Sequence, residues 1–457
     1  MIDYNGKRNI FSKPKKQNNP VRIFIGLLVI LGFLFTIQGL NNGVINNPFL
    51  PTPVPTRTFD SYAQEGDTQF AAGNLKAAIE AYQNAVRIDP NNPDLIAKLV
   101  RIQVYSSSQE TTDANKRAIL EAAIKTASDA ITTFPQNSAL RAVHAFALDW
   151  YATPDIAGDK WQSSLIEAEQ EAVQGIQLDN TNTLALVYYA EILVDQQKWN
   201  QAEQYISQAI QRDSTLMDVF RVNGYVQESL GNYQEAIVNY QKALAITPKL
   251  NFLYISIGAN YRKLGDMSYY GSAQWSDYYH KALDQFQQAV YINDAQTIKD
   301  PIPLISIANT YGQMGDFLSA ARNMLKAVEF TPSEPTVYGQ LGIIYYKGRN
   351  YEGSILPLKC IIRGCTAAES CEVRNHGAPC DSAEVPNIPI QGLPLSQSTV
   401  AYYFTYGSVL AGLHQPSNGY CEEAMKVFAE VRQGFGSDPT IMSIVQEGES
   451  ICQYYGY

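Results

Sequence analysis

The sequence predicts an all-α protein: a solenoid of about eight or nine helix-turn-helix units, preceded by one transmembrane helix and closed by a C-terminal helix. The main observation is a repeated motif. GNYQEAIVNYQKALAITP at 231–248 recurs as GNLKAAIEAYQNAVRIDP at 73–90 and as GDFLSAARNMLKAVEFTP at 315–332, and the first two copies share nine of eighteen positions without a gap. The other observations are an uncharged stretch near the N-terminus and six cysteines confined to the last hundred residues.

Each copy of the motif predicts one amphipathic helix with its own start and stop. It begins with Gly, carries small or apolar residues at helical spacing and closes on Pro. The preceding segment 215–230 predicts a second helix with apolar residues on one side. A pair of about 34 residues has too little core to fold alone, so neighbouring pairs must stack.

The N-terminal residues predict a membrane anchor with its N-terminus in the cytoplasm. Residues 23–40 carry no charge and are long enough to cross about 30 Å of hydrocarbon. Residues 1–22 hold six basic residues against one acidic residue, which keeps this short segment cytoplasmic. A cleaved signal peptide is the alternative, but no A-x-A-like site follows. Residues 41–58 then form a Pro-rich linker.

These units resemble the tetratricopeptide repeat family, whose pattern has a small residue in the first helix, Gly at the turn, and Ala, an aromatic residue and Ala in the second helix before a closing Pro. The best copy supplies Gly224, Gly231, Ala236, Tyr240, Ala243 and Pro248. The resemblance covers roughly residues 59–437 and implies a right-handed α-solenoid. We divide it into a regular solenoid at 59–359, a cysteine-rich loop at 360–397, and a last unit with a capping helix at 398–457.

Several units depart from the pattern. Three turns are expanded: 106–116, 153–161, and an insertion of DMSYYGSAQWSDYY after Gly265. Pro357 falls inside a predicted second helix, where it removes an amide donor and is expected to kink the helix.

The cysteines predict disulfides, because an even number outside the cytoplasm favours them. Cys421 and Cys452 are equidistant from a turn centred between 436 and 437, so we expect them to join the last repeat to the closing helix. For the other four, the preferred pairs are Cys371 with Cys380 and Cys360 with Cys365. The alternative is a metal site of Cys371, Cys380 and His376, although their spacing matches no strong zinc pattern.

Composition and motifs exclude several functions. The chain carries a net charge of −10, and about −15 beyond residue 22, which disfavours nucleic-acid binding. The sequence lacks G-x-S-x-G, a P-loop, H-E-x-x-H, C-x-x-C and C-x-x-C-H. We therefore expect no catalytic residue, no cofactor and no enzyme activity.

The resemblance implies that the first helix of each unit lines a groove for protein partners. Carried over position by position, the groove residues are Glu191, Asp195, Arg221, Tyr225, Glu228, Arg262, Lys263, Asn309, Gln313, Tyr346 and Lys347. The insertion offers a second candidate surface, formed by Tyr269, Tyr270, Trp275 and Tyr278. These aromatic side chains either anchor a partner or fold back over helix ends.

These observations favour a single-pass plasma-membrane protein whose solenoid lies outside the cytoplasm and docks proteins, as an accessory subunit or an assembly factor. One rival hypothesis is an envelope enzyme or metal-binding domain centred on the cysteine-rich loop. Another is a structural solenoid that assembles with copies of itself.

Overall fold

A computed structural model describes residues 19–42, 57–380 and 388–457. It contains two compact units, Met1–Arg57 and Thr58–Tyr457. In the first unit, helix α1 (Pro20–Asn41) is long and apolar enough over Pro20–Gly39 to cross a membrane, and a signal sequence would meet the same criteria. The expected basic segment up to residue 18, and most of the expected linker, lie outside the described residues.

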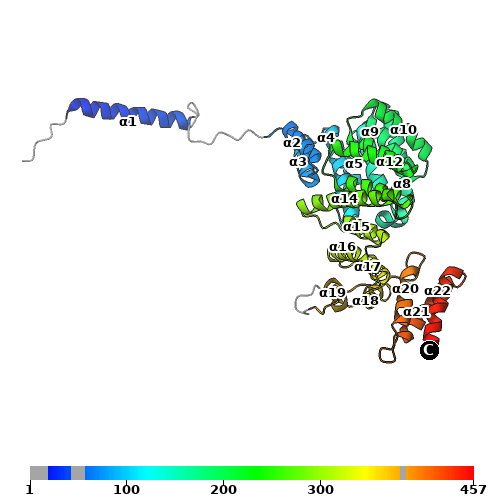
Figure 1. Cartoon of the computed structure of the whole chain (residues 1–457). Coiled ribbons are helices and arrows are strands. Elements are labelled where there is room, and N and C mark those ends of the chain that lie inside the picture. Colours follow the sequence, from blue (N-terminus) through cyan, green and yellow to red (C-terminus); the bar gives the residue numbers. More distant parts are fainter. Residues whose placement is uncertain (1–18, 43–56, 381–387) are drawn as a thin grey trace, which may run out of the picture. The chain divides into compact units, whose positions relative to one another are not determined.

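The second unit is built from helix pairs, as predicted (Figure 1). Among its described residues, all named elements of secondary structure are helices, and one isolated β-bridge joins Cys365 and Ile390. The nine pairs are α2 (Phe59–Ala71) with α3 (Leu75–Ile88), α4 (Pro93–Ser107) with α5 (Asp113–Thr133), α6 (Ser138–Tyr151) with α8 (Trp161–Leu178), α9 (Thr183–Asp195) with α10 (Trp199–Arg212), α11 (Met217–Ser229) with α12 (Tyr233–Ile246), α13 (Asn251–Asp266) with α14 (Ala273–Ala295), α15 (Ile302–Met314) with α16 (Phe317–Phe330), α17 (Pro335–Lys347) with α18 (Tyr351–Ile362), and α20 (Val400–Gly412) with α21 (Tyr420–Phe435). The closing helix is α22 (Pro439–Tyr454).

In five of the pairs, a glycine of the first helix faces a large residue of the second. The rings of Tyr82 and Tyr240 lie so close to Gly66 and Gly224 that a Cβ atom added there would come within 2.7 and 2.8 Å. Phe428 approaches Gly407 in the same way. This close approach is why these pairs need a small residue at that position, and it sets the register of the two helices.

The turn within a pair requires a left-handed backbone residue. Gly73, Gly231 and Gly315 adopt φ values of 75°, 81° and 81°. The equivalent turns before α10 and α18 place Gln197 and Arg349 at φ 61° and 62°, which residues with a Cβ adopt less readily.

The inserted segments are more helical than expected. In the insertion after Gly265, only 267–272 connects two helices, and α14 already begins at Ala273. Trp275 and Tyr278 therefore lie on a helix and not on a loop, because Trp275, Tyr279 and Phe286 follow a helical period along one side. The turn at 153–161 holds the short helices α7 (Pro154–Ala157) and η1 (Gly158–Lys160).

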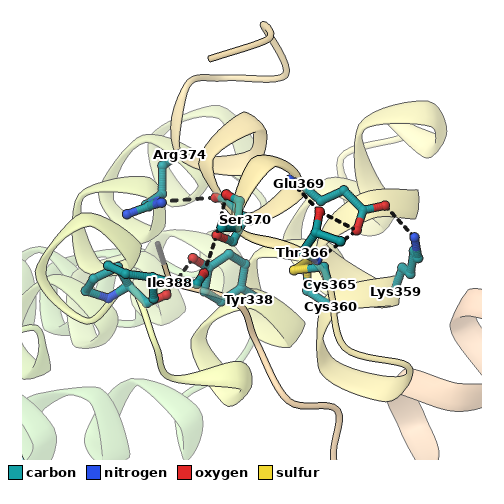
Figure 2. Close-up of a disulfide and its surroundings, with 11 residues drawn as sticks. Tyr338, Lys359, Cys360, Cys365, Thr366, Glu369, Ser370, Arg374 and Ile388 are labelled. Carbon is teal, nitrogen blue, oxygen red and sulfur yellow. Dashed lines mark hydrogen bonds and ion pairs between the residues drawn. A yellow bond between two sulfur atoms is a disulfide. The ribbon is translucent and has the colours of Figure 1, made fainter. Parts of the chain in front are cut away.

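Helix α18 continues through Pro357, so this unit keeps both of its predicted helices. One further expectation needs correction. The predicted cysteine-rich loop 360–397 is partly ordered: Cys360 lies within α18, and helix α19 (Ala367–Arg374) follows. A capping box between Thr366 and Glu369 starts α19, Lys359 forms an ion pair with Glu369, and the Ser370 hydroxyl donates to the Ile388 carbonyl at 2.7 Å (Figure 2).

All six cysteines form disulfides in the pairs preferred from the sequence: Cys360 with Cys365, Cys371 with Cys380, and Cys421 with Cys452. The last of these joins α21 to α22 inside the terminal hydrophobic cluster. The disulfides are therefore confined to the C-terminal half. There the apolar core consists of separate clusters, whereas one large cluster runs from α2 to α13, with a smaller one beside it around α8.

Replacing Gly224 with alanine tests the packing within a pair. The new methyl group would overlap the Tyr240 ring, so we expect a loss of about 1–3 kcal/mol in the free energy of unfolding. Gly312→Ala is the matched control, because no atom lies within 4 Å of its added Cβ and alanine favours the helix. Thermal unfolding of the full chain in mild detergent measures both. Equal stability of the two variants would show that the close approach is not required.

Candidate functional site

The inner face is defined here as the side of the first helices that carries Glu191, Tyr225, Asn309 and Ser408. Each of these residues directly follows the small residue that packs against the second helix, Ala190, Gly224, Ala308 or Gly407. Because they occupy the same helical position in successive units, they lie on one side of the solenoid. The predicted groove residues belong to this face, but they fall into two regions with different environments.

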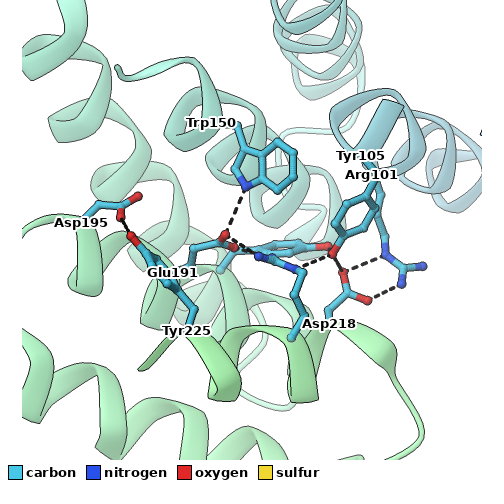
Figure 3. Close-up of polar contacts among 9 residues, drawn as sticks. Arg101, Tyr105, Trp150, Glu191, Asp195, Asp218 and Tyr225 are labelled. Carbon is cyan, nitrogen blue, oxygen red and sulfur yellow. Dashed lines mark hydrogen bonds and ion pairs between the residues drawn. The ribbon is translucent and has the colours of Figure 1, made fainter. Parts of the chain in front are cut away.

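In the first region, α2 to α13, the inner face is filled by its own side chains. Arg221 and Glu191 are only 5% and 4% exposed. The Arg221 guanidinium donates from its two terminal nitrogens to the two Glu191 carboxylate oxygens at 2.6 and 2.5 Å. The indole of Trp150 donates to the same carboxylate at 3.1 Å (Figure 3). The prediction that Glu191 and Arg221 face a partner is therefore wrong in this structure.

A second buried ion pair joins units that are distant in sequence. The Asp218 carboxylate is fully buried and pairs with Arg101 of α4, whose Nε donates at 3.0 Å. The hydroxyls of Tyr105 and Tyr188 donate to it at 2.6 and 2.8 Å. Burial favours the neutral form of the Asp218 carboxyl group. The positive charge of Arg101 and the hydrogen bonds to the carboxylate together have the larger effect, and the pKa of Asp218 is lowered to about 2.

Aromatic side chains occupy the rest of the inner face in this region. Phe146 stacks on Tyr188 with ring centroids 4.2 Å apart, and Tyr105 stacks on Phe252 of α13 at 5.8 Å. The Arg221 guanidinium lies 5.4 Å from the centroids of Tyr105 and Phe146. The first helices α4, α6, α9 and α11 pack directly against one another around this cluster. We name it the central network and define it as Arg101, Tyr105, Trp150, Tyr188, Glu191, Asp218 and Arg221.

Two carboxyl groups lie beside the central network. Asp149 of α6 is 3% exposed, and no donor reaches its carboxyl oxygens among the described residues. Burial, and then the negative charges of Asp195 and Glu191, raise the pKa of Asp149 well above its ordinary value. Asp195 lies at the exposed rim, where it accepts the Tyr225 hydroxyl at 2.5 Å and has a pKa raised to about 6. Asp149 is the more buried of the two, so its surroundings favour the neutral form of its carboxyl group more strongly.

In the second region, α13 to α20, the inner face is open. Arg262, Lys263, Asn309, Gln313 and Lys347, all predicted groove residues, line one cavity of about 430 Å³ together with Asp266, Gln340 and Tyr402. Between α11 and α17, successive first helices contact each other less than those around the central network do. The predicted residue Tyr346 lines a neighbouring cavity of about 400 Å³ between α17, α20 and α22. Glu228, by contrast, is used internally, since it accepts from Tyr240 at 3.0 Å and from Asn260 at 2.9 Å.

The aromatic residues of the insertion also fall into an exposed group and a half-buried group. Tyr269 and Tyr270 are 87% and 71% exposed, whereas Trp275 is half-buried between Tyr270 and Tyr279. Tyr278 is half-buried and stacks near Tyr261. The alternative metal site is not formed, because Cys371 and Cys380 are bonded to each other. No cluster of three metal-ligating side chains occurs in the parts of the chain that are described.

Comparisons with known proteins agree with this architecture. A family model described as TPR repeat matches residues 66–99, and one described as tetratricopeptide repeat matches residues 224–250. The chain therefore contains tetratricopeptide repeats in these two segments. Stacked repeats of this kind support a role as a protein–protein interaction scaffold. No curated protein matches the sequence.

Solved structures share the tetratricopeptide fold at low identity. A human IFIT1 dimer with m7Gppp-AAAA is 14% identical, with 88% of this chain and 91% of that chain covered at a TM-score of 0.52. A monomeric mutant of IFIT1 is also 14% identical, with 87% and 81% covered at a TM-score of 0.53. The chain spans about half (53%) of the matched chain in the APC/C hetero-tetramer Cut9–Hcn1, which covers 69% of this chain with 14% identity and a TM-score of 0.49. At such identity the likeness concerns the fold alone.

Replacing Arg221 with methionine tests whether the central network supports the repeats around it. The change leaves the buried Glu191 carboxylate without its cation, and we expect a loss of about 3–5 kcal/mol in the free energy of unfolding. Adding Glu191→Gln should recover part of that loss, because it removes the unpaired charge. Arg212→Met, on the exposed side of α10, is the control and should have little effect. Chemical denaturation of the four proteins measures the differences, and a wild-type midpoint for Arg221→Met would contradict the role assigned to the pair.

The Asp149–Asp195 pair predicts a pH dependence of stability. Carboxyl groups with raised pKa values in the folded state contribute most stability below about pH 4 and lose it as the pH rises through about 6 and above. Asp149→Asn keeps the shape without the charge, so it should match the wild type at pH 4 and exceed it by about 1 kcal/mol or more at pH 8. Melting temperatures across this range, with exposed Asp284→Asn as the control, measure the effect. Parallel curves for the wild type and Asp149→Asn would refute it.

Proposed function

We propose that the chain is a membrane-anchored scaffold that presents its tetratricopeptide repeats outside the cytoplasm and docks protein partners on the inner face between α13 and α22. The observation that carries this proposal is the division of that face. Five predicted groove residues surround one open cavity, while Glu191 and Arg221 are buried and form an ion pair with each other. A partner therefore has access to the later units, whereas the earlier units hold the fold together.

Three features support the placement in the membrane and outside the cytoplasm. Helix α1 has the length and hydropathy of a membrane span, and basic residues precede it in the sequence. Every cysteine lies in a disulfide, which suits an oxidising compartment. We place the protein in the plasma membrane, as an accessory subunit or an assembly factor of a larger complex.

Charge reversal in the open cavity tests the proposal. The double variant Lys263→Glu, Lys347→Glu changes two exposed side chains on different helices and should leave the fold intact. Purified in mild detergent from the native membrane, it should retain less than about a tenth of the partner proteins found with the wild type. This loss corresponds to about 1.4 kcal/mol or more of binding free energy. Quantitative mass spectrometry of the bound proteins measures the ratio.

Lys326→Glu is the matched control, since Lys326 is an exposed lysine on the second helix α16, away from the cavity. It should retain every partner. Partners at near-integer ratios to the scaffold would identify a stable subunit, and substoichiometric partners that salt removes would identify an assembly factor. Identical partner sets for the wild type and the double variant would disprove docking in this cavity.

A further inference from the structure

The two cavities of the later units lie along one continuous face. Gly258, Gly342 and Gly407 pack against Phe286, Leu358 and Phe428, so they mark the same position in α13, α17 and α20. Asn309 and Ile343, which line the first cavity, and Ser408, which lines the second, each follow that position directly. The two cavities therefore follow one another along the same face of the solenoid.

The first cavity presents cations without matching anions. Arg262, Lys263 and Lys347 line it with only one carboxylate, that of Asp266, and Asp266 already accepts the Tyr279 hydroxyl at 2.5 Å. None of the ion pairs among the described residues uses these three cations. The chain as a whole is acidic, at −10, so this positive patch stands out against its surroundings.

Arg262 gives a second indication of an anionic ligand. Its guanidinium lies 5.7 Å from the Phe286 ring centroid, and among the described residues it donates a long hydrogen bond, 3.5 Å, to the Ser306 carbonyl. Burial lowers its pKa, and the negative charge of Asp266 offsets this only in part. A partly buried cation without an ion-pair partner is costly, and a carboxylate brought by a partner would remove that cost.

The second cavity has a different character. Tyr346, Phe404, Ile444 and Ile451 line it, with Glu447 as its one charged residue. Tyr346 and Ile451 remain 37% and 36% exposed. An apolar hollow with aromatic walls suits a bulky apolar side chain.

We infer that this face binds an extended protein segment that carries an acidic side chain for Arg262, Lys263 and Lys347 and a bulky apolar side chain for the hollow beside Tyr346, Phe404 and Ile451. The inference rests on the proposed function and specifies the partner. The cavities lie about two helix spacings apart, roughly 20 Å at about 10 Å per packed helix. An extended chain crosses that distance in about six residues. Nucleic acid fits less well, because three cations and an apolar hollow provide few phosphate contacts.

Synthetic peptides test the spacing. The probes are fluorescein-labelled, C-terminally amidated peptides in which a Glu-Glu pair and a Leu-Phe pair are separated by two, four, six, eight or ten Gly/Ser residues. Fluorescence polarisation with the full-length protein in mild detergent should show the tightest binding near six residues. Peptides that lack either pair, and a single-stranded RNA decamer of adenosine, should bind at least tenfold more weakly.

Variants of the protein assign each half of the peptide to its cavity. Lys263→Glu, Lys347→Glu should weaken binding at least tenfold and remove the preference for Glu-Glu. Ile451→Ser, at an exposed position, should weaken binding several-fold and remove the preference for Leu-Phe, and Lys326→Glu should change neither. Affinity independent of spacing, or equal affinity for the RNA decamer, would overturn the inference.

This outcome is separable from that of the proposed function. If the double lysine variant loses its native partners but no peptide of the series binds the wild type, the cavity docks proteins and the two-part motif is wrong. If the native partners also remain bound to the double variant, both proposals fail.

Discussion

The arrangement of this solenoid depends on one buried pair of charges, Arg221 with Glu191, and on its neighbour, Arg101 with Asp218. A buried ion pair is rarely a large net source of stability, because desolvation offsets the attraction between the charges. Its effect here is geometric. The four side chains accept only partners at hydrogen-bond distance, so they fix how far α4, α9 and α11 can separate. With that part of the inner face occupied, the open cavities on this face are formed by the units from α13 onward.

The sequence predicted the repeating part of the fold well. The period of the motif, the small residue facing a large one, and the turn glycines are local features that a single chain reveals, and each reappears in the structure. Cys421 and Cys452 could be paired because two antiparallel helices around one turn leave little freedom. The sequence did not predict the helical course of 273–279, because these inserted residues match no position of the repeat pattern.

The central network could not be predicted in the same way. Whether Arg101 meets Asp218 depends on the curvature of the solenoid, which accumulates from small rotations between many repeats and has no local sequence signal. One indication was present: Tyr105, Trp150, Tyr188 and Phe252 are large aromatic residues on the first helices of their units. Such residues favour a filled face. The predicted groove residues that stay accessible are those of the units in which no buried network fills the inner face.

The contact between Arg101 and Asp218 also bears on how the chain folds. In most repeat proteins each unit contacts only its neighbours, so folding can begin at any unit and spread along the array, and an end can open by itself. Here a contact spans 117 residues, and the entropy of closing so long a loop must be recovered by several units at once. The units from α2 to α13 should therefore fold and unfold as one cooperative block. The later units contact mainly their neighbours along the chain, so they should open more independently of one another.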